Sequence, residues 1–200
     1  MIDKQGIILK NDDMLVRPVQ VSDITDEYID GLNDPDVNRY LVAVRQQHQT
    51  RESVTQYVKA DWDNPLSILF GIFTRNDDGP LVGTVRVHNI DLFHFLASAG
   101  VCLFAKRAWK RGYAHRALRM VKDWLFADGE LHYLEAGVYA ENVDSLNCFL
   151  RAGFAERYRV SGKFRHIDSF ADVIFLAAIN DVFDLNPLKV ESRHRPLMRK

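Results

Sequence analysis

The sequence predicts a mixed α/β fold with a mostly antiparallel central sheet of about six to seven strands flanked by helices. Three observations support this prediction. Strand-like segments rich in β-branched and aromatic residues follow one another between residues 67 and 106, amphipathic helical segments alternate with strands after that, and the 200 residues are 47% hydrophobic. A chain of this length and composition buries one core well. We therefore expect a single domain over residues 1–180 and a C-terminal tail over residues 181–200.

The first part of the chain indicates a short strand followed by helices. Residues 15–19 form a strand-like run. Ser22 precedes three acidic residues, and we expect it to be the N-cap of a helix over residues 22–34. Thr50 precedes a second segment, residues 50–62, in which apolar side chains recur at helical spacing. A proline between these segments predicts an interruption of the helical region.

The rest of the chain alternates between strands and helices. The predicted elements are strands at 67–75, 81–90 and 96–106, a helix at 112–129, a strand at 133–140, a helix at 141–154, and strands around 157–167 and 169–179. Gly129 is the expected stop of the first of these helices. This order favours one sheet with helices on its faces.

The overall charge gives no reason to expect a polyanion or a membrane as partner. Acidic and basic residues nearly cancel, with a formal net charge of -1, so we expect no nucleic acid and no membrane among the partners. The N-terminus has no leader-like apolar core, and no run approaches the roughly 18 apolar residues of a membrane helix, which predicts a cytoplasmic protein. Cys102 and Cys148 lie in apolar segments without metal-site spacing, so we expect buried thiols and no metal.

The segment AWKRGYAHRALR, residues 108–119, concentrates positive charge at the junction of a strand and a helix. The basic residues around Gly112, with no acidic residue among them, are Lys106, Arg107, Lys110, Arg111, His115, Arg116 and Arg119. A strand that turns through a glycine into a helix presents free backbone N–H groups and the positive end of the helix dipole, which suits a pyrophosphate. The pattern is neither a Walker loop nor a dinucleotide fingerprint. On this segment alone, a basic surface that faces water or binds nucleic acid stays an alternative.

A second motif, NVDSLNCFLRAGF, begins thirty residues after Gly112 and follows the strand YLEAGVYA. The strand LASAGVCLF, the turn WKRGYA, and then Asn142, Ser145 and the pair Gly153-Phe154 resemble the GNAT superfamily of acetyl-CoA-dependent N-acetyltransferases. The segments LVRPVQVSDI, LNDPDVNRYL and LVGTVRVHNI are similar to the branch with the ribosomal-protein N-terminal acetyltransferases and related small-amine and aminosugar acetyltransferases. The resemblance covers roughly residues 14–179 and implies a GNAT-like sheet.

The resemblance implies an N-acetyltransferase that moves an acetyl group from acetyl-CoA to a primary amine while both substrates are bound. The amine would belong to a protein N-terminus, an aminosugar or another small molecule. The residues implied to bind the cofactor are Lys110, Arg111, Gly112, Tyr113, Ala114 and His115 at the diphosphate, Cys102, Leu103 and Phe104 along the pantetheine arm, and Asn142 near the thioester. Ser145 would lie close to Asn142.

The sequence departs from the family pattern at two positions that usually move protons. Phe149 stands where many members have a tyrosine that protonates the leaving thiolate, and Ser98 stands where related members have a glutamate. The candidate catalytic residues are therefore Ser145 and Glu135, and the further candidate bases are His88, Asp91 and Glu156. A substrate amine of low pKa needs less help from a base. Alternatively, the two departures indicate a GNAT-like module that binds CoA as a sensor, with weak or lost catalysis.

The acidic residues are also unevenly distributed. Nine of them fall in the first 36 positions, several in the helices that border the acceptor site in relatives. They would either attract a cationic amine or face water. The exposed final strand and the basic tail are compatible with a homodimer.

Overall fold

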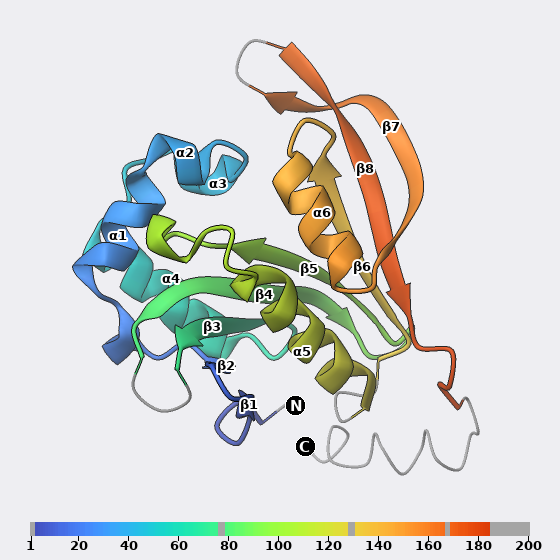
Figure 1. Cartoon of the computed structure of the whole chain (residues 1–200), viewed down its shortest axis with the longest axis horizontal. Coiled ribbons are helices and arrows are strands. Elements are labelled where there is room, and N and C mark those ends of the chain that lie inside the picture. Colours follow the sequence, from blue (N-terminus) through green and yellow to red (C-terminus); the bar gives the residue numbers. More distant parts are fainter. Residues whose placement is uncertain (1–2, 76–78, 128–130, 167–168, 185–200) are drawn as a thin grey trace.

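The computed structural model describes residues 3–75, 79–127, 131–166 and 169–184, which form one sheet covered by helices (Figure 1). The sheet has eight strands in the order β1-β2-β3-β4-β5-β6-β8-β7. The strands are β1 (Leu9–Lys10), β2 (Met14–Pro18), β3 (Ile68–Thr74), β4 (Leu81–Asp91), β5 (Leu96–Cys102), β6 (Tyr133–Tyr139), β7 (Ala155–His166) and β8 (Ser169–Ile179). Neighbouring strands in these ranges are antiparallel except β5 and β6. The mixed, mostly antiparallel sheet is confirmed, with the two-residue β1 as an additional strand.

The helices follow the predicted order, with short pieces between the first two long ones. They are α1 (Asp26–Asn33), α2 (Pro35–Asn38), α3 (Val42–Arg45), α4 (Arg51–Asp63), α5 (Tyr113–Ala127) and α6 (Val143–Arg151), with 3-10 turns η1 (Val21–Asp23) and η2 (Lys106–Ala108). None of these helices is long and apolar enough to cross a membrane. The expected stop at Gly129 and residues 185–200 of the tail lie outside the described residues, and the domain boundary at residue 180 stays a prediction.

The first helix begins later than predicted, because Ser22 is not its N-cap. Ser22 lies in η1, and Thr25 caps α1 by accepting a hydrogen bond from the amide of Tyr28 at 3.2 Å. The cause is Asp23, whose two carboxylate oxygens bind the two η nitrogens of Arg17 at 2.7 and 2.8 Å. This ion pair holds the segment in a tight turn, so the regular helix starts only at the next capping residue.

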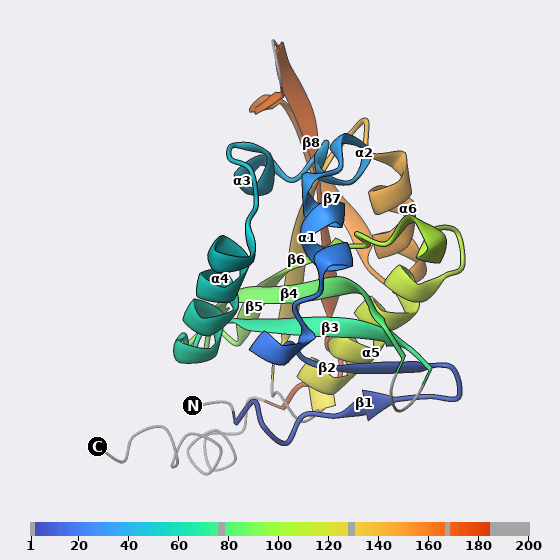
Figure 2. The same ribbon diagram turned by 90° about the vertical axis from the view of Figure 1, so that its left-hand side faces the viewer.

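The sheet separates two layers of helices, as Figures 1 and 2 show. Phe70 of β3 contacts Trp124 of α5 edge to face, with ring centroids 5.9 Å apart. Leu69, the preceding residue, pairs with Arg86, whose guanidinium lies 5.2 Å from the ring of Tyr57 on α4. Because successive strand residues point to opposite faces, α5 covers one face, beside α6, and α4 covers the other, beside α1.

The sheet opens between its two parallel strands. β5 and β6 pair only at Leu96 with Tyr133, Ala97 with Leu134 and Ser98 with Glu135. Beyond these pairs, β5 continues along β4 to Cys102, whereas β6 continues along β8 to Tyr139. The strands diverge visibly in Figure 1. We call this opening, between residues 99–102 and 136–139, the β5–β6 fork.

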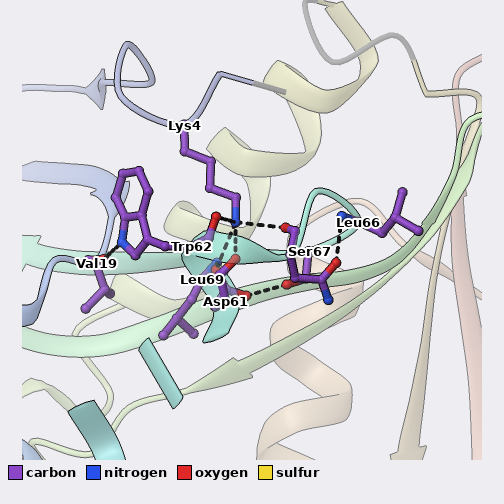
Figure 3. Close-up of polar contacts among 8 residues, drawn as sticks. Lys4, Val19, Asp61, Trp62, Leu66, Ser67 and Leu69 are labelled. Carbon is purple, nitrogen blue, oxygen red and sulfur yellow. Dashed lines mark hydrogen bonds and ion pairs between the residues drawn. The ribbon is translucent and has the colours of Figure 1, made fainter. Parts of the chain in front are cut away.

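A buried polar cluster anchors the N-terminal segment to α4 and β3 (Figure 3). Both carboxylate oxygens of Asp61 accept hydrogen bonds, from Ser67 Oγ at 2.5 Å and from Leu69 N at 2.8 Å. Lys4 Nζ lies 3.6 Å from Asp61 Oδ2 and donates to the Asp61 carbonyl oxygen. Burial lowers the pKa of Lys4, and the charge of Asp61 opposes that shift. The two side chains are 5% and 4% exposed, so the ion pair is buried.

Replacing Asp61 by alanine would remove the negative charge beside the buried ammonium of Lys4 and leave the donors of Ser67 and Leu69 without their acceptor. Breaking one partner of a buried ion pair costs about 3–5 kcal/mol, and we expect the free energy of unfolding measured by urea titration to fall by that amount. Asp63→Ala, two residues along and exposed, is the matched control and changes stability by less than about 0.5 kcal/mol. Equal effects of the two substitutions would contradict the role given to this cluster.

Candidate functional site

A pocket of about 520 Å³ opens in the β5–β6 fork. Its lining consists of Ala99, Gly100 and Val101 on β5, Gly137, Val138 and Tyr139 on β6, Asn142, Ser145 and Phe149 at α6, and Tyr40, Leu41, Val42, Phe164 and Arg165. We call this last group, which joins the α2–α3 segment to β7, the outer end of the pocket. The pocket thus links α6, through the fork, to the outer end.

Backbone groups form the centre of the pocket. Beyond Ser98, β5 is paired only with β4, so alternate N–H and C=O groups of residues 99–102 point into the fork without a strand partner in the described ranges. The floor is open at Gly100, where a Cβ atom would meet no atom within 4 Å. An extended ligand with amide groups can pair with this edge as an added strand does.

Asn142 and Ser145 lie together at the start of α6. Asn142 is the N-cap, and its Oδ1 accepts a hydrogen bond from the backbone N–H of Ser145 at 3.2 Å. The side-chain amide nitrogen of Asn142 and the hydroxyl of Ser145 have no hydrogen-bond partner within the described chain. Both residues line the pocket, so both groups can meet a ligand there.

Phe149 forms an apolar wall beside them. Its side chain is 2% exposed and packs edge to face on Phe154, with ring centroids 5.0 Å apart.

Burial raises the pKa of the neighbouring Cys148 to about 12, so this thiol is protonated and is not a nucleophile. The hydroxyl of Ser145 is therefore the group on α6 that can pass a proton into the pocket.

The residues implied to follow the pantetheine arm lie beyond the pocket, whose lining on β5 ends at Val101. Burial raises the pKa of Cys102 to about 12. The carbonyl oxygen of Leu103 accepts a hydrogen bond from Trp109 Nε1 at 2.8 Å, and Phe104 stacks on Tyr28 at 4.4 Å. Leu103 and Phe104 thus pack the turn that leads out of β5. The free strand edge lies earlier in the strand than the sequence motif indicates.

The turn before α5 has the form of an anion cradle. Lys110 and Gly112 have positive φ angles of 60° and 80°. The amides of Trp109 and Arg116 donate to Lys106 O and Gly112 O, but no backbone amide between them donates to any described residue. Several N–H groups are therefore free at the positive end of a 15-residue helix.

Part of the positive charge around this turn is neutralised within the protein. The ion pairs are Lys106 with Asp34 at 2.7 Å and with Asp36 at 2.6 Å, Arg107 with Glu27 at 2.7 Å, and Arg116 with Asp13 at 2.7 Å. Lys110 and Arg111, next to Gly112, are exposed and make no ion pair in the described ranges. These two side chains are the ones available to an anion on the cradle.

The same ion pairs explain the acidic N-terminal segment. Six of its nine acids bind basic side chains: Asp13, Asp23, Asp26, Glu27, Asp34 and Asp36. Glu27, Asp34 and Asp36 fasten the layer of α1 and α2 to η2. Most of these carboxylates are therefore partners of arginine and lysine. Seven of the nine acids are also exposed, so the expectation that they face water holds for most of them.

The outer end of the pocket is aromatic, and sequence reasoning missed it. Tyr40 and Tyr139 lie with ring centroids 5.4 Å apart, and His166 stacks on Tyr40 at 5.1 Å. The hydroxyl of Tyr139 donates to the carbonyl oxygen of Arg165 at 3.3 Å, and Phe164 contacts the same ring. The segments involved are about a hundred positions apart, and no motif marks them. The fork brings them together.

Glu135 lies at the base of the fork. It pairs with Ser98, whose hydroxyl donates to its Oε1 at 3.4 Å. Glu135 does not line the pocket, but it is two residues before Gly137 and shares that residue's face of β6. His88 pairs with Ser98 from the other side, and burial together with the nearby Arg86 lowers the pKa of this histidine.

The other candidate bases do not line the pocket. Asp91 Oδ2 lies 2.8 Å from Nδ1 of His94 on the turn after β4, and Glu156 is exposed on β7. Among the described residues, no group of three or more histidine, cysteine, aspartate or glutamate side chains is placed to hold a metal ion. Of the candidate bases, Glu135 and His88 are thus the two that pair with Ser98 at the base of the fork.

Residues 13–155 match the family model of the acetyltransferase (GNAT) domain. A relative from Bacillus subtilis (strain 168), named Probable N-acetyltransferase YjcK, is 29% identical over 153 residues, 74% of this chain and 83% of the relative. The structure of ribosomal-protein-S5-alanine acetyltransferase from Vibrio fischeri has a TM-score of 0.73 at 21% identity and covers 90% of this chain and 100% of its own. The structure of spermidine N-acetyltransferase from Vibrio cholerae in complex with CoA and spermine has a TM-score of 0.74 at 17% identity. The match covers 86% of this chain and 98% of that chain. These structures share the fold of this chain.

His115, in the first turn of α5, is predicted to titrate below the ordinary histidine value of 6.5. Burial lowers its pKa most, and the nearby Arg151 guanidinium lowers it further. The folded protein therefore binds fewer protons here than the unfolded chain, and this residue costs stability progressively as the pH falls through 6.5. An NMR titration of the imidazole measures the midpoint, and Arg151→Gln should move it upward. A midpoint at or above 6.5 in the native protein contradicts the prediction.

Proposed function

This chain belongs to the GNAT acetyltransferase family, and we propose that it moves the acetyl group of acetyl-CoA to a primary amine by direct attack, with both substrates bound together. The observation that supports this proposal best is the pocket in the β5–β6 fork. This pocket has a free strand edge at the centre, so a thioester on the α6 side can meet an amine that enters from the outer end. The structure of the Vibrio cholerae neighbour contains a cofactor and an amine, CoA and spermine.

In this proposal, acetyl-CoA lies on the α6 side of the fork. Its diphosphate binds the cradle formed by Lys110, Arg111, Gly112, Tyr113, Ala114 and His115, where the backbone amides are free. The pantetheine arm pairs with the edge of β5, along Ala99–Val101 and toward Cys102–Phe104. The side-chain amide of Asn142 faces the thioester.

The reaction forms a bond between the amine nitrogen and the carbonyl carbon and breaks the carbon–sulfur bond of the thioester. The amine loses a proton, and the leaving thiolate gains one. We assign the base to Glu135, acting through water because it lies below the pocket, and the acid to Ser145, whose hydroxyl is free. A backbone N–H on the edge of β5 stabilises the oxyanion. The amine of a protein N-terminus or of an aminosugar has a low pKa, so a weak base is sufficient to deprotonate it.

A second candidate function is a CoA-binding module or sensor with weak or lost catalysis. Two observations favour it: Phe149 presents an apolar wall where a tyrosine would supply a proton, and Ser98 replaces a glutamate at the fork. The two functions share the cofactor and differ in whether thiol is released when an amine is present.

Gly112→Asp should abolish the stabilisation by acetyl-CoA. The change places a carboxylate in the cradle and a Cβ atom on a residue with φ of 80°, 3.0 Å from the His115 ring. A ligand at a hundred times its Kd stabilises by about 2.7 kcal/mol, which for a chain of this size raises Tm by roughly 5–10 °C. Gly162→Asp, another positive-φ glycine but on β7, is the control and should keep the shift. A native protein without a shift at saturating acetyl-CoA would sink the proposal.

Phe149→Tyr should raise turnover, because its hydroxyl would stand in the pocket wall beside Ser145. A positioned general acid contributes about 10²–10⁴-fold, so we expect kcat to rise about tenfold even from imperfect alignment. Thiol release from acetyl-CoA is measured over peptides, amino acids, aminosugar nucleotides and polyamines, with Phe149→Leu as the control that adds no hydroxyl. Cofactor binding without thiol release for any amine, in the native protein and in the tyrosine variant, would favour the sensor.

A further inference from the structure

We infer that the outer end of the pocket binds an apolar group of the acceptor, so that the acetylated amine is attached next to a large apolar or aromatic substituent. The inference rests on the proposed function, because it places the incoming amine at this end. It adds the chemical class of the acceptor and separates that class from the polyamines.

Three aromatic rings that belong to the pocket lining meet at the outer end. Tyr139 of β6 and Phe164 of β7 lie with ring centroids 5.5 Å apart, and Tyr40, which lies between α2 and α3, approaches Tyr139 to 5.4 Å. Gly137, also in the lining, is two residues before Tyr139 and shares its face of β6. Because Gly137 has no side chain, no side chain of β6 stands between the fork and the Tyr139 ring.

The entrance beside these rings is also apolar. Leu41 and Val42 follow Tyr40 in the lining, and both are partly exposed. Phe164, which reaches the same end from β7, is partly exposed as well. Partly exposed apolar side chains that gather at a pocket from two distant segments are typical of a surface that binds an apolar group.

Arg165 brings its backbone to the pocket and not its charge. Its two neighbours on β7, Phe164 and His166, both contact the Tyr139 ring, with centroids 5.5 and 5.3 Å apart. Because alternate residues of a strand point to opposite faces, the exposed side chain of Arg165 points away from that ring. Its carbonyl oxygen accepts the hydrogen bond of the Tyr139 hydroxyl at 3.3 Å. The lining residues that the structure describes therefore present no charged side chain to the outer end.

A cationic group has no counter-charge at this end. Among the described residues, no aspartate or glutamate is part of the lining. Cations of the protein already lie near two of the rings: the Arg39 guanidinium is 5.2 Å from the centroid of Tyr40, and Lys163 Nζ is 5.9 Å from that of Phe164. An ammonium group of a polyamine would meet like charge here and lose water without gaining a partner. A neutral apolar group gains contact with the rings and avoids both costs.

His166 holds two of the rings in place. It is buried, stacks on Tyr40 with centroids 5.1 Å apart and contacts Tyr139. Glu141 Oε2 lies 3.8 Å from its Nδ1, and this glutamate is exposed and outside the lining. The carboxylate thus belongs to the surroundings of His166 and not to the pocket. Rings that are already fixed by packing lose little conformational freedom when a ligand binds.

Two sources of the amine share this chemistry. One is a peptide or protein whose first residue has a large apolar side chain, and the other is a small amine with an aryl or alkyl chain. Both carry the apolar group a few bonds from the nitrogen. The group can therefore reach the outer end while the nitrogen faces the thioester in the fork.

Four synthetic peptides that differ only in the first residue, which is phenylalanine, leucine, serine or arginine, test the inference. Calorimetry measures their binding to the protein saturated with CoA, and thiol release from acetyl-CoA measures transfer. We expect the phenylalanine and leucine peptides to bind about tenfold more tightly than the serine peptide, and the arginine peptide to bind most weakly. Because burial of apolar surface is not a Coulomb interaction, added salt should leave the preference over serine unchanged. Phenethylamine, ethanolamine and spermidine form the small-molecule arm.

Val42→Asp should reverse the order, because it places a carboxylate at the apolar entrance and so favours the arginine peptide over the phenylalanine peptide. Val42 is the first residue of α3, a position where aspartate is well accepted. The matched control is Ala43→Asp, the next residue, which is exposed and outside the lining and should keep the native order. If Val42→Asp loses the acetyl-CoA thermal shift through misfolding, Phe164→Thr, which keeps a strand-forming residue on β7, should reduce the preference.

Equal binding within both sets of amines overturns the inference, and so does tightest binding of the arginine peptide or of spermidine to the native protein. A native order that persists in Val42→Asp and in Phe164→Thr also overturns it. Preferential binding of the apolar acceptors without thiol release overturns the proposed transfer and keeps the inference. A preference confined to the peptides assigns the apolar group to a first residue, and one confined to phenethylamine assigns it to a small molecule.

Discussion

The site depends on how briefly β5 and β6 remain paired. Three residue pairs join the strands, and after Ser98 and Glu135 each strand follows a different neighbour, β4 or β8. Because each half of the sheet keeps its own ladder of hydrogen bonds, the strands can separate without loss of the sheet. The separation leaves backbone groups of residues 99–102 free and makes room for a pocket. If β5 and β6 were paired over more residues, the fork would be closed and the pocket would no longer connect α6 with the outer end.

Charge has two separate roles in this protein. Lys106 and Arg107, in η2 after β5, are bound to carboxylates at α1 and α2 and hold that layer against the turn before α5. Lys110 and Arg111, only a few residues later, are exposed and flank the cradle of free amides. Basic residues of the same two types, a few positions apart, thus have different roles. Lys106 and Arg107, which have carboxylate partners, hold the structure together, whereas Lys110 and Arg111, which have none among the described residues, are available to a ligand.

Much of the fold follows from local signals in the sequence. The alternating strands, the glycine before α5 and the Asn142 cap with Ser145 depend on residues close together in the chain, so their periodicity and motifs predict them. Tyr40, Tyr139 and Arg165 are different. Each is unremarkable in its own segment, and only the path of the fork brings the three together. The ion pairs of the acidic N-terminal segment also join residues far apart in sequence, and even the start of α1 depends on one of them, between Arg17 and Asp23.

One of the ion pairs between η2 and the layer of α1 and α2 also depends on pH. The hydrogen bond from Lys106 holds the pKa of Asp34 below its usual value. The carboxylate therefore stays charged, and the contact persists, through the ordinary range of aspartate titration, and it is lost as the pH falls through the lowered pKa. The strands beneath are held mainly by backbone hydrogen bonds and apolar packing, with the buried carboxylate of Asp61 as a further contact at Leu69 of β3. Acid thus removes the ion pair between Asp34 and Lys106, whereas the stacking of Tyr28 on Phe104 continues to hold α1 against the turn after β5.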